Sequence, residues 1–305
     1  MDNWKQLNTV RLILASAVAV SHANYIFLLP LGYVAGFPVV QMIAKVAVLL
    51  FFVLSGFIIG RSLQFRRDGL LRFLARRSLR IFPPLVTSFA VVALLSAVLD
   101  LMLIDRSARP EAGLMTNAFE YNHRQFFGAL VTFGLRGELA SPANPALWSL
   151  TLELQCYLAI GLIAQLFVTT SAMLRMGTLF ALALVTLRIF YGASHFWPYY
   201  SAFFAGSFMS LWINRLPKFL PSLSVDFSYS LFIMHFPIML AFFFVFYTPT
   251  FPSTLTAILI GALASAVSVV VALASARWVE SLRRLLPPIS PKEIRTPDRS
   301  RSRGI

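Results

Sequence analysis

Two basic side chains in the first apolar segment are the first candidates for chemistry. Arg11 and His22 lie in the stretch from Asn8 to Phe27, which is otherwise apolar enough for a membrane-spanning helix. Ionisable groups inside a membrane cost free energy, so such residues usually serve a function. His22 follows Arg11 by eleven positions, about three helical turns, so both side chains lie on one face. That face offers an anion-binding group, Arg11, near its start and a proton acceptor, His22, about three turns later.

A carboxylate in a later apolar segment is the next candidate. Glu153 falls within residues 146–168, about seven residues from the end that we expect to face outward. At about 1.5 Å per residue, Glu153 and His22 come to similar depths in the outer half of the membrane. We therefore expect both to face one cavity open to the outer side. A neutral imidazole there is a natural base for a hydroxyl proton.

Four further residues are expected to line the same cavity. Arg188 lies in an apolar segment where packing alone does not explain a charge. His235 lies near mid-membrane, and both a hydrogen bond between helices and a catalytic role are open for it. The other two are Trp148 and Ser230. No metal or resident cofactor is expected.

The composition indicates the class of protein that must position these residues. Of 305 residues, 58% are hydrophobic and only 12% are charged. Apolar runs of about 20 residues recur along the chain, and the shorter alternating runs of a membrane barrel are absent. We predict an all-α, polytopic transmembrane helical bundle. Its eight spans are 8–29, 38–60, 81–104, 146–168, 176–193, 197–213, 226–247 and 254–276, and Gln125–Leu135 is a shorter re-entrant or interfacial segment.

The distribution of positive charge predicts the orientation. The net charge is +14, and the basic residues gather between Arg61 and Arg80 and in the tail after Arg277. Basic segments stay on the cytoplasmic side, so we expect both termini inside and the 105–145 loop outside. Nucleic acid is not an expected partner, because no basic module is separable from the spans. Residues 1–284 form the membrane domain, and residues 285–305 are expected to be a disordered basic tail.

A signal peptide is the alternative for the first segment. Ser21-His22-Ala23 is similar to a small-x-small cleavage site after an apolar run. The apolar character continues to Pro30, however, and Arg11 interrupts its early part. A retained membrane helix is therefore the favoured interpretation.

Six motifs in order carry a resemblance that covers nearly the whole chain. They are R-x10-H at Arg11 and His22, VAVLLFFVLSGFIIGRSL from Val46, FLARRSLRIFPPL with Arg77 and Arg80, ALWSLTLELQCYL with Trp148 and Glu153, DFSYSLFIMHFPI from Asp226, and RWVESLRR from Arg277. In these motifs the chain resembles acyltransferase family 3, the bacterial integral membrane acyltransferases that typically O-acetylate surface polysaccharides. It departs from the family in having eight expected spans where about ten are usual, and Ser281 where proline is frequent.

The resemblance implies a function and assigns roles. It implies transfer of an acyl group, with the acetyl of acetyl-CoA as the expected case, to a glycan or lipid-linked sugar at the bacterial inner membrane. In this chain His22 becomes the catalytic candidate, and Arg11, Arg77 and Arg80 become the residues that handle acyl-CoA. Together with the depth argument, it makes Glu153 a residue that orients His22 or grips the acceptor. Whether the acyl group passes through a covalent histidine intermediate is open.

A transporter or flippase of a lipid-linked sugar is the alternative function. Such a protein would use the same buried polar groups as a path for substrate or protons. The sequence contains no internal repeat of fixed period, and this weighs against an inverted-repeat transporter. Arg77 and Arg80 have a simpler alternative as well, in which they serve only to set the orientation in the membrane.

Overall fold

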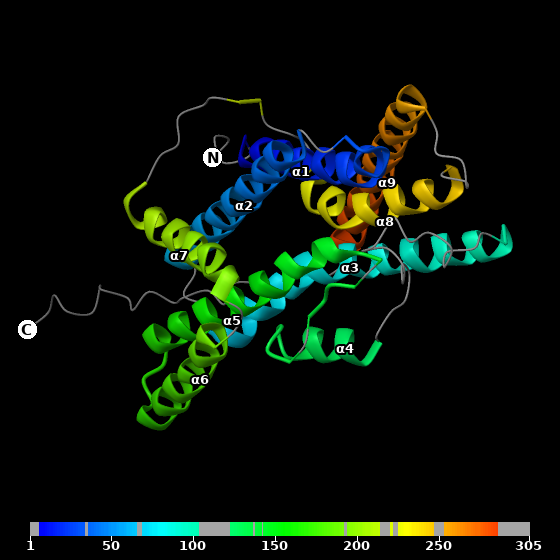
Figure 1. Cartoon of the computed structure of the whole chain (residues 1–305). Helices are drawn as coiled ribbons and strands as arrows, with labels where there is room; N and C mark the ends of the chain where they lie inside the picture. The colour runs from blue at the N-terminus through cyan, green and yellow to red at the C-terminus, as the bar shows by residue number, and fades with distance from the viewer. Residues whose placement is uncertain are drawn as a thin grey trace, which may run out of the picture.

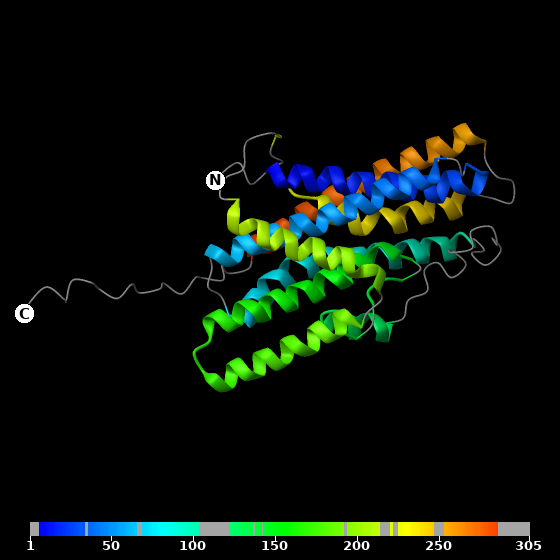
Figure 2. The same ribbon diagram turned by 60° about the vertical axis from the view of Figure 1, so that its left-hand side comes forward.

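The chain folds into a bundle of helices (Figure 1). The computed structural model describes residues 6–33, 36–65, 69–103, 123–136, 138–141, 143–191, 194–213, 220–221, 225–246 and 253–285. Its helices are α1 (Gln6–Ala23), α2 (Phe37–Phe65), α3 (Leu70–Leu101), α4 (His123–Val131), α5 (Trp148–Val168), α6 (Ala172–Phe190), α7 (Trp197–Trp212), α8 (Ser228–Phe246) and α9 (Thr254–Leu285). In Figure 2 most of the long helices run roughly along one direction, as expected for a membrane bundle.

The helical content confirms the predicted fold class. Seven helices in the described ranges are long and apolar enough to cross a membrane, and each matches a predicted span. The eighth predicted span, 197–213, is α7, a helix of only 16 residues. The segment Gln125–Leu135 contains α4, whose nine residues are too few to span. The predicted tail lies outside the described residues, apart from its first residue.

The start of the third span was predicted wrongly. α3 begins at Leu70 and not at residue 81, so most of the basic segment expected as a loop is helical. Leucine, arginine and alanine favour helix, and this preference outweighs the cost of Pro83 and Pro84 within α3. Arg77 and Arg80 therefore lie three residues apart on one face of a membrane helix.

α8 is the central helix of the bundle. In its most apolar stretch 78% of residues are buried, against 11% in the peripheral α6. Pro237 lacks an amide hydrogen, so the carbonyl of Ile233 four residues earlier has no helical donor. Ser88 Oγ and Asn144 Nδ2 donate to that carbonyl at 3.0 and 2.6 Å. These two bonds attach α8 to α3 and to the segment before α5, and they hold α8 in place.

Glycines let α2 and α7 pack with their backbones in contact. A Cβ atom on Gly206 would lie well inside van der Waals contact of the Val53 carbonyl oxygen. One on Gly56 would meet the Phe203 carbonyl oxygen in the same way. Small residues at helix crossings permit such close approach in membranes, where dispersion and polar contacts replace the hydrophobic effect. Gly56 is thus a packing residue.

We predict that Gly206→Ala destabilises the protein by roughly 1–3 kcal/mol, because α7 must move away from α2 to accommodate the methyl group. Gly177→Ala in α6 is the matched control, since a Cβ there meets no atom of the described residues within 4 Å. That control should be neutral or stabilising by up to about 1 kcal/mol through helix propensity. Thermal unfolding in one detergent measures both. Equal melting temperatures for the two variants would contradict the close contact.

Candidate functional site

An ion-pair cluster joins the starts of α1 and α8 to α3. Arg11 Nη1 donates to Asp226 Oδ2 at 3.0 Å, and Arg80 Nη2 lies 3.6 Å from the same oxygen. The Arg11 side chain is 7% exposed and that of Asp226 is 23% exposed, so the contact is largely buried. Asp226 Oδ1 accepts from the hydroxyl and backbone amide of Ser228, which begins α8. The carboxylate therefore caps α8 and binds two guanidinium groups at once.

The surroundings of Asp226 favour its charged form. Burial by itself would raise the pKa of this carboxyl group. Arg11, the hydrogen bonds from Ser228 and Arg80 together outweigh burial and bring the pKa below its ordinary value. Asp226 is thus an anion at neutral pH, and it is the counterion of the two arginines.

A second carboxylate, Glu153, is held by two hydroxyl groups. Ser55 Oγ and Tyr157 OH each donate to Glu153 Oε1 at 2.5 Å. Tyr157 follows Glu153 by four residues, so both lie on one face of α5, while Ser55 comes from α2. The two hydroxyls fix the position of the carboxylate.

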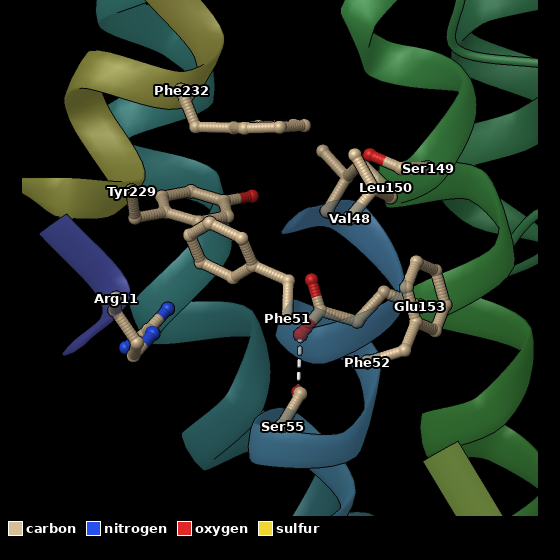
Figure 3. A pocket seen from close by; sticks show the side chains of 10 residues that line it. All are labelled: Arg11, Val48, Phe51, Phe52, Ser55, Ser149, Leu150, Glu153, Tyr229 and Phe232. Carbon is tan, nitrogen blue, oxygen red and sulfur yellow. Dashed lines mark hydrogen bonds between the residues drawn. The ribbon is translucent and has the colours of Figure 1, made fainter. Parts of the chain in front are cut away.

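Arg11 and Glu153 line opposite walls of one cavity (Figure 3). Its volume is about 30 Å³, room for one or two water molecules. The Tyr229 hydroxyl points into the cavity and is buried, and it has no hydrogen-bond partner in the part of the chain that the structure describes. Phe232 lies at the same end of the cavity as Tyr229. Among the described residues the lining is Arg11, Val48, Phe51, Phe52, Ser55, Ser149, Leu150, Glu153, Tyr229 and Phe232.

Arg77 extends the cluster of positive charge through aromatic contacts. Its guanidinium carbon lies 5.5 Å from the ring centre of Phe73 and 5.8 Å from that of Tyr157. These distances are typical of cation–π contacts. The Tyr157 ring thus packs on Arg77 while its hydroxyl binds Glu153. Arg11, Arg77 and Arg80 come from two helices to one level of the bundle.

The two intramembrane histidines form a pair. His22 Nδ1 lies 2.7 Å from His235 Nε2, and the rings are nearly parallel, 12° apart. His235 Nδ1 is 2.9 Å from the carbonyl oxygen of Leu231. His235 is completely buried, whereas His22 is partly exposed. α1 ends one residue after His22 and continues as a π-helical turn, Asn24–Leu28, a feature frequent at functional sites.

The structure confirms one expectation about these residues and corrects another. Arg11 and His22 share a face of α1, because Arg11 contacts Asp226 just before α8 and His22 contacts His235 within α8. Glu153 was expected at the depth of His22, but it lines the cavity with Arg11 and its hydrogen bonds go to Ser55 and Tyr157. His235 follows Tyr229 by six residues, so the histidine pair lies about 9 Å further along α8. The depth estimate failed because the helices are offset along their axes.

The remaining predicted cavity residues lie elsewhere. Trp148 stacks on Phe196 with ring centres 5.3 Å apart. Arg188 is exposed and donates from Nε to the carbonyl of Leu135 at 3.1 Å. Ser230 is buried in α8. None of these three predicted residues is in the lining of the cavity that holds Arg11 and Glu153.

Sequence reasoning assigned no role to several residues of the site. Asp226 was visible as an acidic residue at the start of a span, where it can cap a helix and pair with arginine. Tyr157 was visible four residues after Glu153. Ser55 and Tyr229 left no such signal, because their partners are far away in the chain.

The comparisons with known proteins identify relatives. A family model described as an acyltransferase domain matches residues 4–225. A protein of Shigella phage Sf6 described as an O-acetyl transferase is 29% identical over 170 residues, which cover 50% of this chain and 44% of that protein. The chain thus matches less than half the length of this relative. No solved structure matches the chain.

We predict that Asp226→Asn lowers the free energy of unfolding by roughly 1.5–3 kcal/mol at neutral pH, because the charge-assisted hydrogen bond from Arg11 and the ion pair with Arg80 are weakened. The folded pKa of Asp226 is depressed, so its contribution is complete above the unfolded value near 3.8 and is lost as the pH falls through the folded value. The gap between wild type and variant should therefore close in acid. Unfolding curves at several pH values measure it, with Asp100→Asn as control. A gap that persists at the lowest pH would contradict the ion-pair origin.

Proposed function

Because the chain belongs to this acyltransferase family, we propose that it transfers an acyl group, acetyl by preference, from acyl-CoA to a hydroxyl of a cell-surface sugar or glycan. The name of the phage relative supports O-acetylation. The acyl-CoA donor and the sugar acceptor are part of the proposal.

The observation that carries the proposal is the arrangement along α1. A partly exposed imidazole, His22, lies about three turns beyond a cluster of guanidinium groups on the same helix face. Three arginines against the carboxylates of Asp226 and Glu153 leave one formal positive charge in excess. This suits a donor whose anionic end binds at the arginines and whose thioester lies near the imidazole.

The proposed reaction is a direct acyl transfer. His22 accepts the proton of the acceptor hydroxyl while the oxygen attacks the thioester carbonyl. The tetrahedral intermediate collapses, the carbon–sulfur bond breaks, and the imidazolium returns its proton to the leaving thiolate. An acyl-histidine intermediate is the other form of the same chemistry.

Arg11, Arg77 and Arg80 are proposed to bind the phosphates of acyl-CoA. Guanidinium groups offer two parallel N–H donors and bind phosphate oxygens more specifically than ammonium groups. Arg11 and Arg80 already share Asp226, so a phosphate would compete with this carboxylate for part of their donors. Arg77 differs from these two arginines, because its guanidinium group packs on the two aromatic rings of Phe73 and Tyr157.

Glu153 is proposed to bind the donor or acceptor within the cavity. Its place in the cavity beside Arg11 favours this role over orienting His22.

The proposed location is the bacterial inner membrane, with both termini in the cytoplasm. This proposal rests on the distribution of basic residues.

Purified protein in detergent tests the function directly. Incubation with radiolabelled acetyl-CoA and a glycan acceptor should give labelled glycan and free CoA thiol in equal amounts. Bacteria that lack the protein should show less acetyl on their surface glycans. Movement of a lipid-linked sugar across vesicles without consumption of acetyl-CoA would instead support a flippase.

We predict that His22→Gln lowers turnover about 10²–10⁴-fold, because an amide does not accept a proton near neutral pH. The variant should still bind acetyl-CoA, since the arginines are untouched. His195→Gln is the matched control, because His195 is exposed and outside the pair. Single-turnover assays and equilibrium donor binding measure the two effects. Turnover of the variant near that of wild type would exclude His22 as the base.

We predict that Arg77→Ala raises the KM for acyl-CoA about 10-fold or more. This corresponds to a loss of roughly 1.5–3 kcal/mol in the free energy of donor binding. Arg77→Lys should restore part of the loss, since lysine keeps the charge but not the planar fork. Arg72→Ala is the control, because Arg72 is exposed on the same helix. Initial rates against donor concentration give the result. An unchanged KM in a folded variant would mean that Arg77 serves only to set the orientation of the protein in the membrane.

A further inference from the structure

The histidine pair contains a second residue that the proposed reaction does not yet use. We propose that His235 is a positioning residue that fixes the tautomer of His22, so that Nε2 of His22 is the nitrogen that accepts the proton. This inference rests on the proposed function, which makes His22 the base. It adds the hydrogen-bond chain that prepares His22 for that task.

The series of hydrogen bonds begins at a group that can only accept a hydrogen bond. The Leu231 carbonyl oxygen lies 2.9 Å from His235 Nδ1. A carbonyl has no proton to give, so Nδ1 of His235 must carry the hydrogen and donate it. A neutral imidazole has one N–H, and the Nε2 of His235 is therefore an acceptor.

The second bond transmits this assignment to His22. His235 Nε2 lies 2.7 Å from His22 Nδ1. Since the former is the acceptor, His22 Nδ1 must carry the hydrogen. The Nε2 of His22 is left with a free lone pair, as a general base requires. One backbone carbonyl thus sets the protonation pattern of both rings, much as a second partner orients a histidine in catalytic triads and metal sites.

Burial decides which of the two histidines reacts. His235 is completely buried, and each of its ring nitrogens has a partner. His22 is partly exposed and uses only Nδ1 in the pair. Of the two rings, only that of His22 keeps a nitrogen, Nε2, that the two hydrogen bonds of the pair do not use, and His22 is also the less buried residue.

The packing around the pair keeps this geometry. The ring of Phe236 meets the His22 ring edge-on, with centres 5.2 Å apart. The carbonyl of Ile233, in the same turn of α8 as Leu231 and His235, is held by Ser88 and Asn144. These bonds attach α8 to α3 and to the segment before α5 two residues from Leu231, and they support the geometry of the pair.

Three substitutions of His235 separate positioning from packing. In His235→Gln the amide oxygen can occupy the place of Nε2 and accept from His22. In His235→Asn the shorter amide can reach Leu231 but leaves His22 without an acceptor, and His235→Met keeps volume alone. We expect turnover to fall about 10–100-fold in the Asn and Met variants, the usual loss for such partners, with a smaller fall in the Gln variant. The KM for acetyl-CoA should stay constant in all three.

A spectroscopic measurement tests the tautomer without any activity. The chain has four histidines, so ¹⁵N-histidine spectra in lipid bilayers can be assigned by loss of one signal pair in His22→Gln. We expect His22 of the wild type to carry its proton on Nδ1, and His235→Met to shift the proton partly to Nε2. Melting temperatures of the variants show whether each is folded.

The outcomes are distinct. A wild-type His22 protonated on Nε2 overturns the proposal, as does equal turnover in the Gln, Asn and Met variants. Loss of activity in His235→Gln together with retention in His22→Gln would assign the base to His235 and overturn it as well. If the wild type transfers no acyl group, the proposed function fails, while the spectra still decide the tautomer.

Discussion

The contact between α1 and α8 is the interaction on which the site depends. Two mostly apolar helices meet there through two polar bonds, Arg11 to Asp226 and His22 to His235. Between apolar helices in a membrane, polar contacts and close packing hold the arrangement, because water does not drive association. Arg11 and His22 are eleven positions apart on α1, and Asp226, just before α8, is nine positions ahead of His235, so the two helices run side by side in the same direction. Rotation of either helix would break both bonds.

The rest of the bundle supports that contact by satisfying backbone groups and by close packing. Pro237 frees a carbonyl in α8, and side chains of two neighbouring segments bind it. An unpaired carbonyl in a membrane costs several kcal/mol, so these bonds also keep α8 in place. At the other side, Gly56 and Gly206 bring α2 and α7 into backbone contact. α2 in turn supplies Ser55, which holds Glu153 beside Arg11.

The all-helical membrane fold could be predicted because it follows from local composition. Runs of about 20 apolar residues can only be helices in a bilayer, and their positions agree with the structure to within a few residues in most cases. The start of α3 was missed because charge was taken as a sign of a loop, although Arg77 and Arg80 are good helix formers. The common face of Arg11 and His22 was predictable too, since helical periodicity alone determines it.

The sequence by itself determined the spans, the shared face of α1 and the residue types that acyl transfer needs. Only the tertiary structure decided which of them meet. Glu153 lies with Arg11 and not with His22, because the axial offset between helices depends on packing along their whole lengths. The packing of α8 against α1 likewise brings Asp226 to Arg11 and His235 to His22. Their partners on α1 are more than 200 residues away in the chain, and no local pattern encodes such a distance.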